Sequence, residues 1–270
     1  MFLDKMKIRR KETSQLFDMR TFSLKQVILI FWGVITGAEC RKGSAERQLS
    51  LQTGGSVTIP CHYDSKYTEH KKYWCYEARS IYSFCSTLAY ANETKGNVSV
   101  IDHPDQSLFT VTMSDLQSKD TGAYWCAVEI EGIFKVDETE ELYMTIQSVP
   151  DLSVVSSSVT GQEGGNISVQ CLCSSGYKSK DKQWCRYKDK RCSVVGKTDT
   201  SQNPSVQISD DGRESFSVVM TGLTESDSGW YWCSVGDRQV PVQLTATVTE
   251  TKPAVVTTEA GFKIEMLVDY

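Results

Sequence analysis

Apolar and polar residues alternate in four short stretches of the chain, residues 57–63, 109–113, 167–173 and 216–220. A period of two is typical of β-strands that bury one face, whereas an amphipathic helix repeats every 3.6 residues. A pair of glycines precedes the first and the third stretch, as expected for a turn. Short alternating strands separated by turns predict an all-β protein built from β-sandwiches.

One pattern of cysteine, tryptophan and tyrosine occurs twice along the chain. In each copy a cysteine is followed after twelve residues by Trp-Cys, and Asp-x-Gly-x-Tyr-Trp-Cys closes the pattern further on. The two tryptophans, Trp74 and Trp184, lie 110 residues apart. A repeat of this length indicates two tandem domains of one kind. In such a protein we expect function to lie in loops and surfaces and not in a catalytic pocket.

The Cys…Trp…Cys spacing is that of an immunoglobulin β-sandwich. In this fold the outer cysteines lie on opposing sheets, so we expect the bridges Cys61–Cys126 and Cys171–Cys233. The chain-entropy estimate for such loops is about 4 kcal/mol each. The tryptophan packs against the bridge, and the tyrosine two residues before the last cysteine forms the tyrosine corner.

The cysteine after each tryptophan needs another partner, because adjacent strand residues point to opposite faces. Cys75 therefore faces outward, and its expected partner is Cys85, across a hairpin. Cys185 and Cys192 repeat this arrangement. We expect each short bridge to contribute about 2–3 kcal/mol and to stiffen the sheet face that such domains use for binding. A zinc site is disfavoured because the spacings lack Cys-x-x-Cys pairs.

Cys173 is left over from this pairing. It shares a strand face with Cys171 and corresponds to the inward-facing Tyr63 of the first domain. A buried free thiol is the simplest interpretation. Rearranged pairing or an intermolecular bridge is the alternative.

The ends of the chain differ in composition from the two domains. Residues 1–40 hold a nine-residue apolar run at 27–35 after Arg20 and Lys25, which predicts a secretory signal peptide with an N-terminal extension. A signal-anchor is the alternative. The predicted organisation is listed in order: first immunoglobulin domain 41–148, second immunoglobulin domain 149–248, and a stalk-like tail 249–270 without a transmembrane helix. We expect a protein that is secreted or on the extracellular face of the plasma membrane, with membrane anchoring only in a longer product.

Charge and titratable residues exclude several classes of function. The formal net charge is −5, so the chain lacks the overall excess of basic residues that is typical of nucleic-acid-binding proteins. The three histidines form no cluster with acidic or cysteine partners at metal-ligand spacing, and no Gly-x-Ser-x-Gly or phosphate-binding loop is present. We therefore expect a binding protein with no catalytic residues, no metal and no cofactor, and not an enzyme.

The segment Lys72-Tyr73-Trp74-Cys75, joined to Cys85 and to Asp-x-Gly-x-Tyr-Trp-Cys, resembles the polymeric immunoglobulin receptor family. That family includes related myeloid receptors, and the two-domain layout looks most like its fish members. The resemblance covers about residues 48–248. The sequence departs from the family's pattern in two ways. In the second domain Gln183 replaces the tyrosine of Lys-Tyr-Trp-Cys. In addition, V-type domains usually carry an Arg that pairs with the Asp of Asp-x-Gly, and that position holds Asn97 in the first domain and Ser205 in the second.

The resemblance implies two tandem V-type immunoglobulin domains that act in extracellular recognition. The ligands it implies are polymeric immunoglobulin, or an anionic phospholipid or glycan as for the myeloid relatives. A homophilic adhesion molecule is the structural alternative. Binding to anionic surfaces is expected to weaken with ionic strength, which separates the two ligand classes in part.

Candidate ligand-binding residues lie in loops at one end of the first domain and in one basic stretch of the second. The basic stretch, residues 178–191, holds seven Lys or Arg and two Asp. Each candidate also has a plain interpretation as a solvated loop or, for Phe134, as a side chain folded back on its own sheet. The candidates are Tyr67, Glu69, His70, Arg79, Tyr82, Ile133, Phe134, Lys188 and Arg191.

Three sequons, at Asn92, Asn97 and Asn166, are predicted N-glycosylation sites. Asn203 is followed by Pro and is not one. We expect glycans near Asn92 and Asn97 to keep that edge of the first domain out of an interface.

Overall fold

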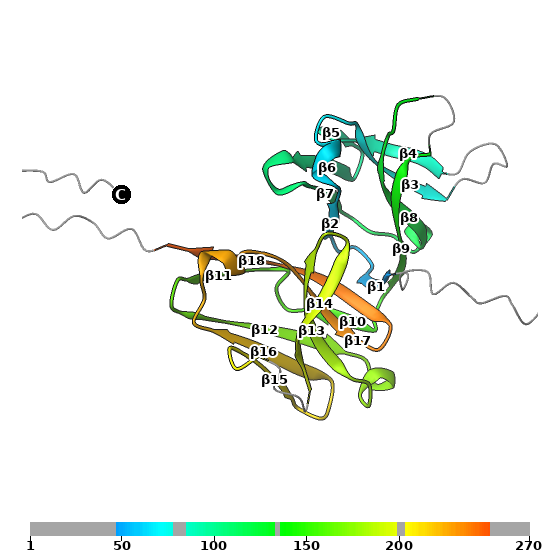
Figure 1. The fold of residues 1–270 in the computed structure, drawn as a ribbon. Coiled ribbons are helices and arrows are strands. Elements are labelled where there is room, and N and C mark those ends of the chain that lie inside the picture. The colour runs from blue at the N-terminus through cyan, green and yellow to red at the C-terminus, as the bar shows by residue number, and fades with distance from the viewer. Residues whose placement is uncertain (1–46, 78–84, 133–135, 199–202, 249–270) are drawn as a thin grey trace, which may run out of the picture. The chain divides into compact units, whose positions relative to one another are not determined.

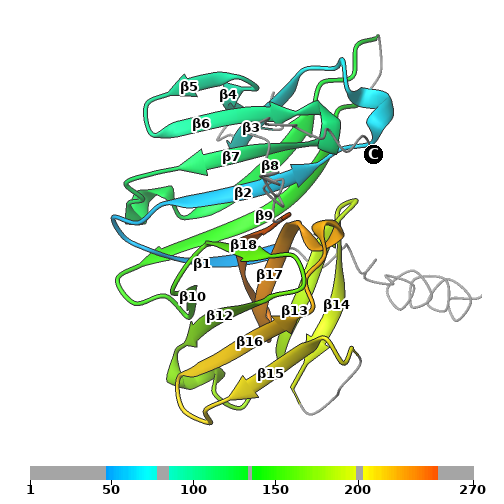
Figure 2. The same cartoon turned by 90° about the vertical axis from the view of Figure 1, so that its left-hand side faces the viewer.

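The computed structural model describes residues 47–77, 85–132, 136–198 and 203–248. They form two β-sandwiches in tandem, as Figures 1 and 2 show. The structure is nearly all-β, as predicted; its helical segments are three-residue 3₁₀ turns. We call the sandwiches the first module (47–147) and the second module (152–247).

The strands of the first module lie in two sheets that are antiparallel except for the pairing of β1 with β9. One sheet has the order β1-β9-β8-β3-β4, in which β1 runs parallel to β9, and the other has the order β2-β7-β6-β5. The strands are β1 (Arg47–Gln52), β2 (Val57–His62), β3 (Lys72–Glu77), β4 (Cys85–Tyr90), β5 (Glu93–Lys95), β6 (Val98–His103), β7 (Leu108–Met113), β8 (Gly122–Val128) and β9 (Glu138–Gln147). The 3₁₀ turns are η1 (Ser65–Tyr67), η2 (Pro104–Gln106) and η3 (Ser118–Asp120).

The second module repeats this plan. One sheet has the order β14-β13-β17-β18 with β11 parallel to β18, and the other has the order β10-β12-β16-β15. Strand β18 also pairs in parallel with β1, so the first of these sheets continues into the β1-β9-β8-β3-β4 sheet of the first module as one ten-stranded sheet. The strands are β10 (Leu152–Val154), β11 (Ser158–Gln162), β12 (Asn166–Cys173), β13 (Lys182–Lys188), β14 (Arg191–Lys197), β15 (Val206–Asp210), β16 (Ser215–Thr221), β17 (Gly229–Val235) and β18 (Arg238–Thr247). The 3₁₀ turns are η4 (Ser175–Tyr177) and η5 (Glu225–Asp227).

The core of each module is built around tryptophan, tyrosine and a disulfide. Trp74 and Trp184 are fully buried. Trp74 stacks on Tyr124 at 5.2 Å between ring centroids, and Trp184 stacks on Tyr231 at 5.1 Å. The Tyr124 hydroxyl donates to the carbonyl of Asp120 at 2.8 Å, and burial raises the pKa of this phenol to about 12. Tyr231 and Asp227 repeat this tyrosine corner at 2.9 Å.

The aspartate of each Asp-x-Gly motif closes a turn. Asp120 accepts the backbone N–H of Gln117 at 2.9 Å, and Asp227 accepts that of Thr224 at 2.8 Å. Among the described residues neither aspartate forms an ion pair. Asn97, where V-type domains carry Arg, donates instead to the carbonyl of Ser114 at 2.7 Å. A local hydrogen-bonded turn thus takes the place of the Arg–Asp bridge.

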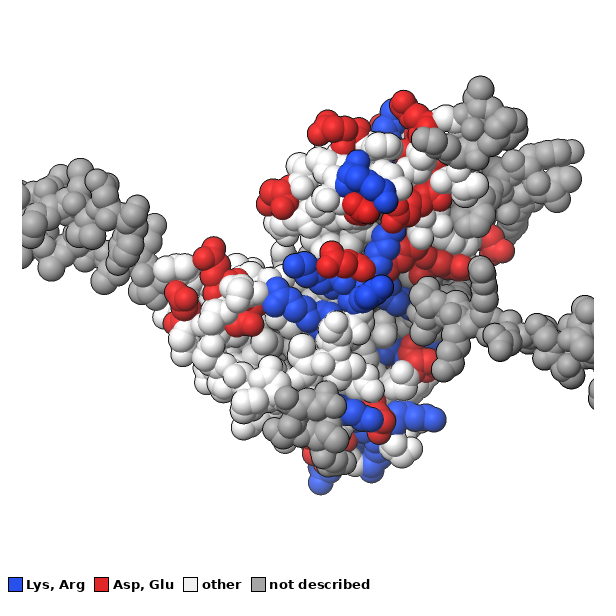
Figure 3. All heavy atoms as spheres, viewed as in Figure 1, with Lys and Arg blue, Asp and Glu red and all other residues white. Residues whose placement is uncertain are grey.

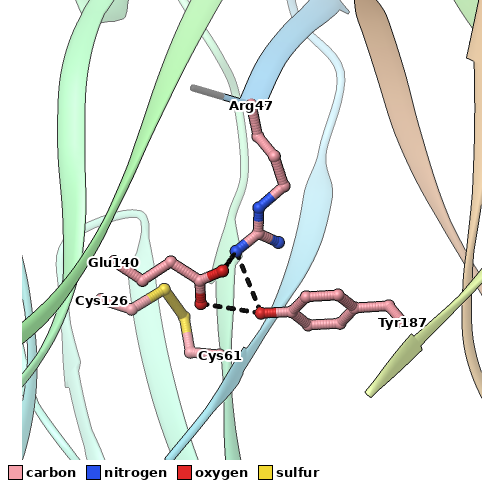
Figure 4. Close-up of a disulfide and its surroundings, with 5 residues drawn as sticks. All are labelled: Arg47, Cys61, Cys126, Glu140 and Tyr187. Atoms are coloured by element: carbon pink, nitrogen blue, oxygen red, sulfur yellow. Dashed lines mark hydrogen bonds and ion pairs between the residues drawn. A yellow bond between two sulfur atoms is a disulfide. The ribbon is translucent and has the colours of Figure 1, made fainter. Parts of the chain in front are cut away.

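A polar and aromatic cluster joins the two modules, and Figure 4 shows its centre. Arg47 of β1 forms an ion pair with Glu140 of β9 and donates to the hydroxyl of Tyr187 of β13 at 3.0 Å. The Tyr187 hydroxyl in turn donates to Glu140 at 2.7 Å. The Arg47 guanidinium also lies over the rings of Tyr187 and Trp232, and His62 meets the Tyr187 ring edge-on at 5.0 Å. The sheet face around Tyr187 is therefore buried between modules, unlike the open binding face that the Cys185–Cys192 pair was expected to stiffen.

Candidate recognition site

The turn that follows β2 presents three of the predicted ligand-binding residues together. Asp64 caps η1 by accepting the backbone N–H of Lys66 at 3.1 Å, and His70 N–H donates to the Tyr67 carbonyl at 3.0 Å. The rings of Tyr67 and His70 meet edge-on at 5.1 Å, and Glu69 is exposed beside them. We call residues 65–71 the recognition turn.

A buried lysine holds the recognition turn against the sandwich. Lys72 is 1% exposed, and its Nζ donates to the carbonyl of Thr68 within the turn. The same Nζ forms an ion pair with Asp102 of β6 at 3.0 Å and lies 4.3 Å from the centre of the Tyr63 ring. Tyr63 donates its hydroxyl to Asp102 at 2.9 Å, and burial raises the pKa of this phenol. Since the buried charge is fully partnered, the network fixes the turn relative to both sheets.

Sequence reasoning missed this network, although a signal was present. The second module repeats the buried lysine: Lys182 pairs with Asp210 at 2.8 Å and donates to the Lys178 carbonyl. A lysine two residues before Trp-Cys in both copies is the pattern that could have identified it. The difference between modules is that Cys173 stands in place of Tyr63; this thiol is free and buried, and burial raises its pKa.

A surface hollow of about 570 Å³ opens beside the recognition turn. It lies between residues 68–72 and the turn that joins β4 to β5, and its lining is mostly polar. The lining residues are Thr68, Glu69, His70, Lys71, Lys72, Tyr90, Ala91, Asn92, Glu93 and Asp102.

Several basic side chains of residues 178–191 are bound to different partners and therefore do not form one basic patch. Lys182 is buried against Asp210, Arg186 donates to the carbonyls of Ser226 and Ser228, and Lys190 pairs with Glu138 of the first module. Lys188 and Arg191 remain exposed and lie opposite each other at the end of the β13–β14 hairpin. Figure 3 shows Lys and Arg side chains gathered in the middle of that view, where this hairpin lies in Figure 1.

The remaining predicted residues fall into three groups. Arg79, Tyr82, Ile133 and Phe134 lie outside the described residues. The structure joins the cysteine pairs Cys61–Cys126, Cys75–Cys85, Cys171–Cys233 and Cys185–Cys192. Among the sequon asparagines, Asn92, Asn97 and Asn166 are all exposed.

Sequence comparison places this architecture in a known family. The immunoglobulin V-set domain matches residues 44–145 and 154–250. The chain belongs to the immunoglobulin V-set family. It is 27% identical over 221 residues to the polymeric immunoglobulin receptor of Rattus norvegicus, covering 80% of this chain and 28% of that receptor. The chain thus spans about a quarter of the length of this curated relative.

Two further relatives extend this picture. CMRF35-like molecule 9 of Mus musculus is 38% identical over 108 residues, covering 38% of this chain and 32% of its own. This chain is also similar to the teleost fish polymeric immunoglobulin receptor ectodomain, whose crystal structure is known. The two sequences are 38% identical, the match covers 76% of this chain and 97% of the fish chain, and the TM-score is 0.35. By its two V-set domains and its sequence relatives, the chain is a receptor-like protein of the immunoglobulin superfamily that is related to polymeric immunoglobulin and CMRF35-like receptors, and like them it is not an enzyme. No described helix has the length and apolar character needed to cross a membrane.

Proposed function

We propose that this protein is an extracellular receptor-type protein that binds polymeric immunoglobulin through the recognition turn of its first module. The names of its relatives support the ligand class, because the rat receptor and the fish ectodomain are both polymeric immunoglobulin receptors. The turn supports the location, because the exposed Glu69 lies beside the half-buried rings of Tyr67 and His70. Interface hot spots are enriched in such aromatic anchors.

The observation that carries the proposal is the buried Lys72, which ties the turn to Asp102 and Tyr63. A loop held in one conformation before binding loses less conformational entropy in the complex. An exposed loop without such an anchor loses that conformational entropy when the ligand binds, which weakens the affinity. A fixed turn is therefore suited to recognition of a folded protein.

The test is binding of the 41–248 fragment to immobilised polymeric immunoglobulin at physiological salt. Replacing Tyr67 and His70 by Ala is expected to weaken binding at least tenfold, since truncating a hot-spot side chain costs roughly 2 kcal/mol or more. The control is Tyr177→Ala, which makes in turn η4 of the second module the change that corresponds to Tyr67→Ala. Equal affinities of the two variants would place the binding surface elsewhere.

A second candidate function rests on the exposed Lys188 and Arg191 of the β13–β14 hairpin. Two adjacent cations on an acidic chain favour an anionic surface such as a phospholipid membrane. Replacing both by Ser should then abolish binding to phosphatidylserine vesicles, and raising ionic strength should weaken it in the parent protein. Vesicle binding that persists in the double variant would exclude this hairpin.

A further inference from the structure

The hollow beside the recognition turn has Asn92 in its lining, and this residue begins the sequon Asn92-Glu93-Thr94. We propose that an N-linked glycan on Asn92 folds back into this hollow, so that its first N-acetylglucosamine packs against the module as an internal part of the fold. The hollow is then a built-in sugar site and not a free ligand pocket. Ligand binding is left to the outer surface of the recognition turn.

The side chain of Asn92 is oriented for this role. Its backbone has a φ of 64°, a left-handed conformation that asparagine tolerates better than most residues. Its Oδ1 accepts the backbone N–H of Asp102 at 3.2 Å, which fixes the amide plane. The Nδ2 atom, to which the sugar is attached, donates to no described residue. The amide is therefore held at one end and open at the end that carries the glycan.

The lining of the hollow suits a sugar. Its volume of about 570 Å³ falls within the ~300–1,000 Å³ typical of sites for small molecules. Carboxylates, a histidine and backbone groups of the lining supply donors and acceptors for sugar hydroxyls, and Tyr90 is also part of the lining.

The other two sequons lack these features. The Nδ2 of Asn97 already donates to the Ser114 carbonyl at 2.7 Å. Asn166 is exposed at the start of β12, and the described hollow does not include it. Asn166 therefore serves as an internal control for a glycan that extends into solvent.

The inference requires passage through the secretory pathway, and so rests on the extracellular location in the proposed function. The two fail differently. Failure of animal cells that express the full chain to export it, together with complete absence of sugar from Asn92 and Asn166, would count against that location. Sugar on Asn166 together with a bare Asn92 would overturn this inference alone.

The experiment uses the full chain with Asn97→Gln and Asn166→Gln, which leaves Asn92 as the remaining sequon of the three. The glycan is trimmed enzymatically to a single N-acetylglucosamine and the melting temperature is compared with those of the untrimmed form and of the same protein made without glycosylation. We expect the trimmed and untrimmed forms to melt together, a few degrees above the sugar-free form. A matched chain that keeps Asn166 in place of Asn92 should show no such difference.

Tyr90→Ala provides the second arm, because a packed sugar should lose its benefit when a residue that lines the hollow is truncated. In this variant the sugar-dependent difference in melting temperature should shrink or disappear, whatever its effect on absolute stability. Nuclear Overhauser contacts between the N-acetyl methyl protons and the Tyr90 ring or His70 report the placement directly. Identical melting of the sugar-free and single-sugar forms, or an N-acetyl methyl with no contact to the lining, would overturn the proposal.

Discussion

The lysine before Trp-Cys is the residue on which the recognition turn depends. Lys72→Met should cost about 3–5 kcal/mol, because it leaves Asp102 partly buried without its charge partner and frees the Thr68 carbonyl. Equilibrium unfolding in urea measures this loss. The neighbouring Lys71→Ala is the control; that side chain is exposed, so we expect a change within about 0.5 kcal/mol.

A double-mutant cycle tests whether the charge is the cause. Adding Asp102→Asn to Lys72→Met removes the unpaired charge, so the double variant should be more stable than the sum of the two single effects predicts. Strict additivity would show that packing, and not pairing, sets the cost.

His62 gives the fold a pH dependence. It is buried at the module junction, and burial lowers its pKa below 6.5, although the nearby carboxylates Asp189 and Glu140 act in the opposite direction. Because the unfolded chain binds a proton at higher pH than the folded chain, this residue's contribution is fully present above the unfolded pKa of about 6.5 and is lost as pH falls from there through the lower folded pKa. His62→Gln should therefore flatten the fall in melting temperature between pH 7.5 and pH 5.5. An unchanged slope would assign that fall to carboxylates.

At the scale of elements, strand packing in the second module depends on a glycine. A Cβ built on Gly196 of β14 would lie 2.7 Å from a methyl of Val206 of β15, closer than the two can approach. Gly196→Ala should therefore destabilise the second module by about 1–3 kcal/mol through overpacking. Gly176→Ala in turn η4 is the matched control, because nothing lies within 4 Å of its Cβ position. Thermal unfolding distinguishes them, and equal melting temperatures would mean that β14 moves aside freely.

At the scale of the whole molecule, the Arg47 cluster should make the two modules unfold together. Arg47→Ala leaves Glu140 without its charge partner and Tyr187 without the covering guanidinium. We expect one calorimetric transition in the parent protein and two resolved transitions in the variant. A parent protein that already shows two transitions would contradict coupling through this cluster.

The features that depend on a single module, above all its fold, could be predicted from the sequence. Cysteine and tryptophan spacing carries the β-sandwich fold because strand alternation decides which side chains face the core, as for Trp74 and Cys75. Contacts between distant elements were not predictable. Lys72 and Asp102 lie 30 residues apart on different sheets, and a fully buried lysine is rare unless it is paired.

His62 shows the same limit across modules. Its alternating strand predicts a polar, solvated position, but Tyr187 of the other module covers it. No local pattern in residues 57–63 contains that information. Burial that depends on a second domain has to be read from the structure.

The buried thiol of Cys173 has a practical consequence. A thiol reacts with maleimide as the exposed thiolate, and here it is enclosed in the core of the second module. In the 41–248 fragment its labelling rate would therefore report how often that module opens under native conditions. Cys173, which stands where the first module carries Tyr63, is thus a natural probe of local opening in the second module, and no engineered label is needed.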